Sequence, residues 1–91
     1  MDIEFDPDKD RRNVEKHGIS LARAVDFEIL TFIEDTRFDY GETRYRAWGL
    51  LDGVYHALAF TMRSDRIRII MLRRAREKEI RRHVANRSED Q

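Results

Sequence analysis

The sequence predicts an α+β fold in which two N-terminal helices pack on an antiparallel β-sheet and a basic helix ends the chain. Its 91 residues suit one domain, because two cores of half that length would each be too small to fold unaided. Helix-capping residues come early, and an apolar–polar alternation with tight turns follows. We therefore expect a single domain over residues 1–91, with an ordered core at about 3–86 and one sheet face free for a ligand.

The first elements are predicted from capping residues. Residues 3–5 alternate apolar and acidic side chains, which indicates a short strand. Asp6 and Pro7 then predict a helix start, since Asp is a good N-cap and Pro is favoured at the first helical position. We expect this helix to run to about Lys16 and to end at Gly18, which readily adopts the left-handed conformation.

A second helix is expected after Ser20, a residue type that caps helix N-termini. The apolar residues that would share one face of this helix are Leu21, Ala24, Val25 and Ile29. From Leu30 onward the pattern changes to that of strands, and the first of these is a short one at residues 31–35.

The centre of the chain predicts an antiparallel meander. The strands Arg44–Leu51 and Val54–Met62 flank Asp52-Gly53, a dipeptide that favours hairpins because type I′ turns need positive φ. A third strand is expected at Arg66–Leu72. Residues from 74 to about 86 then predict the basic terminal helix.

Composition excludes several classes of protein. The hydrophobic fraction of 41% is more than a disordered chain carries. Cysteine is absent, which excludes disulfides, thiol catalysis and zinc–thiolate sites and is compatible with a reducing compartment. No apolar run approaches the roughly 20 residues of a membrane span, and no secretory signal opens the chain. We expect a cytoplasmic protein without a membrane partner.

The net charge of zero hides a strong polarity along the chain. Residues 1–43 carry 12 acidic and 6 basic side chains, whereas residues 44–91 carry 6 acidic and 12 basic ones. Arginine, the side chain best shaped for bidentate phosphate contacts, supplies 15 of the 18 basic residues. This polarity indicates RNA, DNA or an acidic protein as partner; the alternative is a solvated basic face that pairs with the acidic half.

Four motifs stand in order along residues 3–85. They are Phe5-Asp6-Pro7…Lys9…Asn13…Lys16-His17-Gly18-Ile19, Gly41-Glu42-Thr43-Arg44-Tyr45-Arg46-Ala47 followed by Gly49-Leu50-Leu51-Asp52-Gly53, Thr61…Arg63…Ile67-Arg68-Ile69-Ile70, and Arg73-Arg74-Ala75…Glu79. In these motifs and their spacing, the sequence resembles the BrnT family of bacterial toxins.

The resemblance implies a fold similar to that of RelE toxins and the activity of a ribonuclease toxin of a type II toxin–antitoxin system, which arrests translation and growth. It also implies a BrnA-type ribbon–helix–helix antitoxin, through which alone the toxin would meet operator DNA. RelE-like enzymes cleave RNA by driving the ribose 2′-OH onto its own phosphate. The resemblance therefore implies no metal and no cofactor.

Two positions depart from the family pattern. Family members usually carry Ser at the position of Met71, so a hydroxyl that would touch phosphate is missing here. They often carry Tyr at the position of His83, where an imidazole can replace the phenol as a proton donor or acceptor.

His83 is the first catalytic candidate. The implied reaction needs a base, an acid and cations for the charge that builds on phosphorus. On a helix, the carboxylate of Glu79 would orient the His83 ring beside cations. The residues that would share this face with His83 are Arg76, Glu79 and Arg87. The alternative is a surface histidine on a solvated helix.

Lys16 and His17 are further catalytic candidates at the end of the first helix. The helix dipole there favours the protonated form of His17, and Lys16 would reach phosphate. The alternative is that both residues only cap the helix. His56, by contrast, is predicted to be structural because strand alternation places it with Leu58 and Phe60.

Arg63 and Arg73 are the expected phosphate clamps and complete the set of catalytic candidates. In strand alternation, Arg73 follows Ile69 and Met71 on one face. The additional candidates for binding RNA or phosphate are Arg44, Arg46, Arg74 and Arg76. The alternative is that about half of these arginines are surface residues paired with acids such as Glu42.

Two other functions remain open from sequence. One is a catalytically weak or inactive module of the toxin fold that binds RNA or its antitoxin, to which the absent hydroxyl at Met71 points. The other is an interaction subunit whose basic helix binds an acidic partner.

Overall fold

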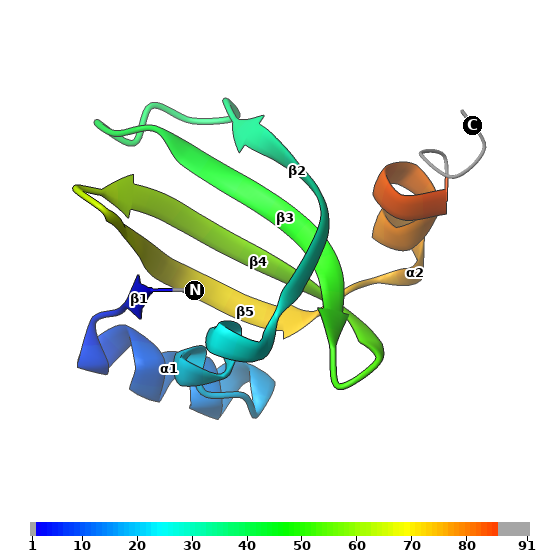
Figure 1. Cartoon of the computed structure of the whole chain (residues 1–91), viewed down its shortest axis with the longest axis horizontal. Helices are drawn as coiled ribbons and strands as arrows, with labels where there is room; N and C mark the ends of the chain where they lie inside the picture. Colours follow the sequence, from blue (N-terminus) through cyan, green and yellow to red (C-terminus); the bar gives the residue numbers. More distant parts are fainter. Residues whose placement is uncertain (1, 86–91) are drawn as a thin grey trace.

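The structure is a computed structural model and describes residues 2–85 (Figure 1). In chain order the elements are β1 (Ile3–Glu4), α1 (Pro7–His17), the 3₁₀ helix η1 (Leu21–Asp26), β2 (Glu28–Asp35), β3 (Arg44–Leu51), β4 (Val54–Arg63), β5 (Arg66–Arg74), α2 (Glu77–Glu79) and the π-helical turn η2 (Ile80–Ala85). The predicted α+β class is confirmed. Residue 86, to which the predicted core extended, lies outside the described residues.

One five-stranded sheet organises the chain, in the order β1-β5-β4-β3-β2. The short β1 pairs parallel with β5, and all other neighbours are antiparallel, so the predicted meander is confirmed. Figure 1 shows α1 and η1 together on one side of the sheet, while α2 follows the end of β5. No helix among residues 2–85 is long and apolar enough to cross a membrane.

Helix α1 begins and ends as its capping residues predict. The Asp6 carboxylate accepts a hydrogen bond of 2.8 Å from the Asp8 N–H. Gly18 has φ 72° and donates its N–H to the Val14 carbonyl at 2.8 Å, an arrangement that few other residues adopt without strain.

The predicted second helix is wrong in type and extent. Ser20 does cap it, accepting from the Ala22 N–H at 3.2 Å, but the element is a 3₁₀ helix that stops at Asp26. Leu21, Ala24 and Phe27 are buried at intervals of three residues. This is the 3₁₀ repeat, so the predicted α-helical stripe does not form.

Two residues of that predicted stripe lie elsewhere than expected. Val25 is 51% exposed, and Ile29 belongs to strand β2. Strand β2 is also longer than the predicted 31–35, and its pairing with β3 shifts register between Ile29 and Thr31.

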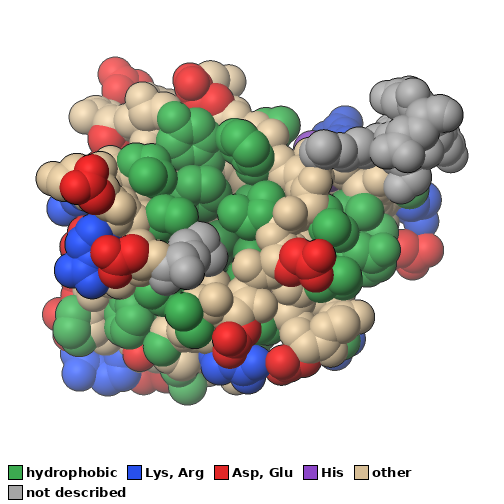
Figure 2. Space-filling view, viewed as in Figure 1, with side chains coloured by type: hydrophobic (Ala, Val, Ile, Leu, Met, Phe, Trp, Pro, Cys, Tyr) green, Lys and Arg blue, Asp and Glu red, His purple; other side chains and the backbone are tan. Residues whose placement is uncertain are grey.

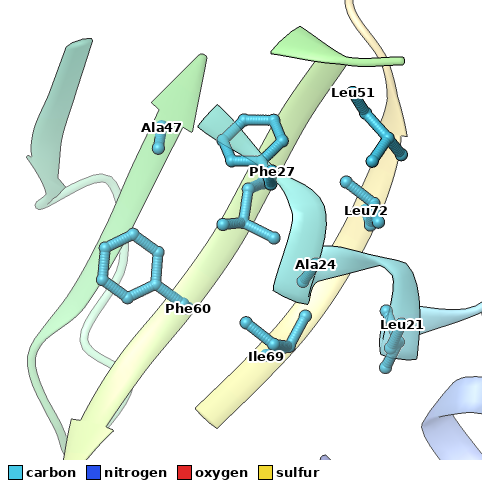
Figure 3. Close-up of a cluster of buried hydrophobic side chains, with 9 residues drawn as sticks. Leu21, Ala24, Phe27, Ala47, Leu51, Phe60, Ile69 and Leu72 are labelled. Carbon is cyan, nitrogen blue, oxygen red and sulfur yellow. The ribbon is translucent and has the colours of Figure 1, made fainter. Parts of the chain in front are cut away.

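The core lies between η1 and the covered face of the sheet (Figure 3). Its buried members are Leu21, Ala24, Phe27, Ala47, Leu51, Leu58, Phe60, Ile69 and Leu72. Burying a large aliphatic or aromatic side chain stabilises the fold by about 1.5–3 kcal/mol, so this single cluster carries much of the stability.

A β-bulge in β5 breaks the predicted alternation of Ile69, Met71 and Arg73. Ala59 pairs with Met71 while the next residue, Phe60, pairs with Ile69, which leaves Ile70 as the extra residue. Ile69 and Leu72 are therefore both in the core. Met71 and Arg73 turn to the other sheet face, so that prediction is corrected.

The terminal helix also differs from its prediction over 74–86. Strand β5 continues through Arg74, and helical structure starts only at Glu77, because the strand pairs with β4 as far as His56. The helix turns into the π-helical η2 at Ile80. Such wide turns are rare and frequently occur at functional sites.

Part of the covered sheet face remains open. Figure 2 shows hydrophobic side chains gathered on the side that carries α1. An apolar groove of about 270 Å³ there is lined by Ile29, Phe32, Tyr45, Phe60 and Met62. Across three strands, Phe32 meets the Tyr45 ring edge to face, and Tyr45 stacks on Phe60.

Gly49 generates a prediction about the fold. A Cβ at this position would lie 1.9 Å from the Glu28 carbonyl oxygen, so β2 reaches β3 only because the side chain is absent. Gly49→Ala should lower the free energy of unfolding by about 2–3 kcal/mol, because the added methyl group would force β2 and β3 apart. A denaturant titration measures this change. The control is Gly41→Ala, because Gly41 has a positive φ but open space where a Cβ would lie. This variant should lower the free energy of unfolding by about 1 kcal/mol. Equal stability of the two variants would contradict this close approach.

Candidate functional site

A cationic groove of about 300 Å³ lies between the uncovered sheet face and the α2–η2 segment. Its lining residues are Arg37, Arg46, Ala59, Met71, Arg73, Arg76, Lys78, Glu79, Arg82 and His83. Six of these carry a positive charge and only Glu79 carries a negative one. We refer to it as the site groove.

Arg73 and Glu79 form the floor of the site groove. The guanidinium of Arg73 donates two parallel hydrogen bonds to the carboxylate, at 2.7 and 2.9 Å, and both side chains are 17% exposed. Glu79 also accepts from the Arg76 backbone N–H at 2.9 Å and from the Trp48 indole at 3.4 Å. The hydrogen bonds from Arg73 above all lower the pKa of Glu79 to about 2, against the effect of burial.

His83 lies flat against Trp48, with ring centroids 3.6 Å apart and planes 7° apart. The sequence predicted that Glu79 would orient this ring; instead the π-helical η2 presents His83 to Trp48, while Glu79 binds Arg73. Burial first, and then the charges of Arg46 and Arg82, lower the pKa of His83 below its usual 6.5. Its imidazole is therefore neutral at pH 7 and able to accept a proton.

Arg46 is the cation best placed to receive an anion. Its guanidinium lies 5.3 Å from the Trp48 ring centroid, so Arg46 and Trp48 share a face of the sheet. Its Nε atom is buried and has no hydrogen-bond partner among the described residues. A buried unpaired N–H costs about 1–3 kcal/mol, which an anionic ligand in the groove would recover.

Lys16 and His17 lie in a neighbouring groove that meets the site groove at Met71, a residue that lines both. Burial and the charges of Lys16, Arg73 and Arg76 lower the pKa of His17. The predicted effect of the helix dipole, which would favour the protonated form, is therefore outweighed.

Arg63 and Arg44 are not brought together with Arg73. Arg63 ends β4, six residues or about 20 Å along the strand from Ala57, the partner of Arg73. There Glu42 binds both arginines, Arg44 at 3.1 Å and Arg63 at 3.5 Å. Hydrogen bonding to Arg44 lowers the pKa of Glu42, so these residues form an ion-paired cluster apart from the site groove.

The remaining candidates divide between two places. Arg76, a candidate phosphate-binding residue, lines the site groove. Arg74 instead lines a separate pocket with His17 and His56. His56 is buried, with Nδ1 2.8 Å from the Val54 carbonyl oxygen, in agreement with its predicted structural role.

Sequence reasoning missed part of what this groove contains. Trp48 lies in a strand, where aromatic side chains usually belong to the core, so the sequence does not indicate its place beside Arg46 and His83. The pairing of Glu79 with Arg73 has no sequence signal, because the two residues belong to different elements. Among residues 2–85, no group of three or more His, Asp or Glu side chains is arranged to hold a metal ion.

The ion pair between Arg73 and Glu79 generates a prediction about stability and pH. A carboxylate with a lowered pKa stabilises the fold above its unfolded value near 4.5, and this contribution is lost as the pH falls towards 2. Glu79→Gln should therefore lower the free energy of unfolding by on the order of 2 kcal/mol at pH 7. The difference in stability between the variant and the wild type should become small near pH 2.

Thermal melts across this pH range measure the effect. Glu77→Gln, which removes an exposed partner of Arg81, is the matched control and should change little. A deficit of Glu79→Gln that is the same at every pH would contradict the pKa assignment.

No curated protein and no solved structure matches the chain. A family model described as "Ribonuclease toxin, BrnT, of type II toxin-antitoxin system" matches residues 5–79, a segment that contains Arg73 and Glu79 and stops before His83. The chain belongs to the BrnT family of ribonuclease toxins of type II toxin–antitoxin systems.

Proposed function

We propose that this toxin is a metal-independent endoribonuclease that cleaves RNA by attack of a ribose 2′-OH on the adjacent phosphate. The observation that carries this proposal is that His83 lies flat on Trp48 beside Arg46, whose buried Nε has no hydrogen-bond partner among the described residues. A proton acceptor and an anion-binding donor thus share one groove.

RNA binding begins with the phosphate. Arg46 donates its unpaired N–H to a phosphate oxygen, and Arg76 adds a second charge from the groove wall. Arg73 keeps its charge beneath them, although Glu79 holds its position through two hydrogen bonds. A fixed array of cations is worth most when it faces the charge that develops in the transition state.

His83 acts as the general base. It takes the proton of the 2′-OH, the oxygen forms a bond to phosphorus, and the bond to the 5′-oxygen breaks. This gives a 2′,3′-cyclic phosphate and a 5′-hydroxyl end. Stacking on Trp48 fixes the ring plane without engaging the ring nitrogens, which leaves one of them for the substrate.

The leaving 5′-oxygen requires a proton from the opposite side of phosphorus, because attacking and leaving oxygens lie roughly in line. Lys16, beyond Met71 from His83, is the proton donor that we assign to that side, and the adjacent His17, whose pKa is lowered, lines the same groove as a neutral imidazole. Arg44, Arg63 and Arg74 have no role in this scheme, since they lie outside the site groove.

In the cell, this activity would cleave messenger RNA, inhibit translation and arrest growth in the cytoplasm of a bacterium. A BrnA-type ribbon–helix–helix antitoxin would neutralise the toxin by covering the site groove or the α2–η2 segment and would bring it to operator DNA. The overall arrangement of the chain would then be that of a RelE-like toxin.

A binding module without strong catalysis is the second candidate function. Met71, which lies between the two grooves, offers no hydroxyl to a phosphate. The charge of Arg73 is also partly neutralised by Glu79. Such a module would retain RNA or its antitoxin in the same groove without cutting.

Metal independence is the first testable consequence. Purified protein should cleave an oligoribonucleotide at an unchanged rate in excess EDTA, because the arginines of the site groove supply the cationic charge. The product should carry a 2′,3′-cyclic phosphate, which mass spectrometry identifies. Activity that disappears in EDTA and returns with Mg²⁺ would overturn the mechanism, and retention without cleavage would favour the binding module.

Substitutions at His83 test the assigned base. His83→Phe keeps an aromatic ring against Trp48 but accepts no proton, and it should lower the cleavage rate by about 10²–10⁴-fold with little change in melting temperature. His83→Tyr keeps both the ring and an ionisable group and should retain activity within about tenfold of the wild type.

The pH profile of the same assay gives an independent check. A base of lowered pKa stays neutral until the pH falls below 6.5, so the wild-type rate should decline only below that value. Full activity of a folded His83→Phe variant would remove His83 from the reaction.

A further inference from the structure

A second groove, of about 200 Å³, runs between helix α1 and strand β5. Its lining residues are Lys9, Arg12, Asn13, Lys16, His17, Ile70 and Met71. We call it the helix groove. Among the residues that the structure describes, three cations and no carboxylate line it, although the N-terminal half of the chain is acidic overall.

The cations of the helix groove lie on one side of α1. Lys9, Arg12 and Lys16 are spaced by three and four residues, which places them in a row on one helical face. The row covers seven residues, or about 10.5 Å along the helix axis. None of the three forms an ion pair within the described part of the chain.

The acids at the start of α1 are engaged elsewhere. Asp6 caps the helix, and Asp8 pairs with Arg11 on another face. Asp10 accepts hydrogen bonds from the Ser20 hydroxyl and the Leu21 N–H, at 2.9 and 2.7 Å. The positive row therefore keeps its charge.

The helix groove continues into the site groove. Met71 lines both, and the strand edge beneath them is open to α1 because β1 pairs only with Ile67 and Arg68 of β5. A ligand that extends from Arg46 past Met71 would thus meet Lys16 and then the rest of the row.

We infer that the helix groove binds the backbone of the RNA strand beyond the cleaved phosphate, with Lys9 and Arg12 as the residues that contact phosphates outside the reacting site. This inference rests on the proposed function. A strand is favoured over an acidic protein because the row is linear, joins the site groove and has only two apolar side chains, Ile70 and Met71, in its lining.

The experiment measures binding of 2′-O-methyl oligoribonucleotides, which lack the attacking hydroxyl and so report affinity independently of cleavage. Fluorescence anisotropy compares a trinucleotide with a strand of about 12 nucleotides over a range of salt concentrations. The test variant is Lys9→Ala/Arg12→Ala. The control is Arg11→Ala/Arg66→Ala, which removes the same charge from exposed positions outside both grooves.

The test variant should bind the long strand roughly tenfold more weakly, and its salt dependence should fall by about 1.4 in logarithmic slope. Its affinity for the trinucleotide should change by less than about twofold, and the control should match the wild type within the same margin. Circular dichroism melts establish that both variants are folded.

Equal losses in the test and control variants would overturn the inference, because net charge alone would then explain them. A loss confined to binding of a poly-glutamate peptide would also overturn it, in favour of an acidic protein partner. Cleavage of unmodified RNA is measured in a separate assay, so that binding and catalysis are judged independently. A length-dependent loss in a protein that cuts no RNA would support the helix groove while removing the proposed catalysis.

Discussion

The side chain of Asn13 joins the two halves of this molecule. Its amide donates to the Leu72 carbonyl at 2.7 Å and accepts from the Leu72 N–H at 3.3 Å, so it pairs with the open edge of β5 as a neighbouring strand would. The same amide donates to the Ile19 carbonyl at 2.8 Å, which holds the turn after α1. One buried amide makes all three hydrogen bonds. If α1 moved away from β5, the polar groups of Asn13 and Leu72 would lose their partners, at a cost of about 1–3 kcal/mol for each buried group.

The contact between Asn13 and Leu72 positions the candidate site. Leu72 is fixed from the side by Asn13 and lies in the core, and the next residue, Arg73, projects to the opposite face. Lys16 and His17 follow Asn13 within one helical turn. The hydrogen bonds between Asn13 and Leu72 therefore fix the site groove relative to the groove beyond Met71, which holds the proposed proton donor. The bulge at Ile70 is the local condition for this geometry, because it shifts Leu72 inward and Arg73 outward.

Much of the fold could be predicted because its signals are local. The Asp6 and Gly18 caps, the Ser20 cap and the Asp52-Gly53 hairpin each depend on a few adjacent residues, and each was confirmed. The errors come from long-range packing: the 3₁₀ form of η1 and the π-helical η2 both depend on what the segment packs against. The same limit applies to the site, where one groove is lined by His83, Arg73, Arg46 and Arg76 and leaves out Arg63. Strand register, which sequence leaves open, decides this.

The charge distribution connects the fold with the proposed substrate. A chain of zero net charge would be a poor ligand for a polyanion if its charges were mixed evenly. Here several acids cap helices or bind arginines: Asp35 holds Arg37, at the border of the site groove, at 2.8 Å, and Asp52 holds Arg23 at 2.7 Å. These pairs restrain loops and turns, whereas Lys9, Arg12 and Arg46 form no ion pair with any carboxylate of residues 2–85. Most ion pairs thus stabilise the fold, and the excess of positive charge lies along the two grooves that meet at Met71.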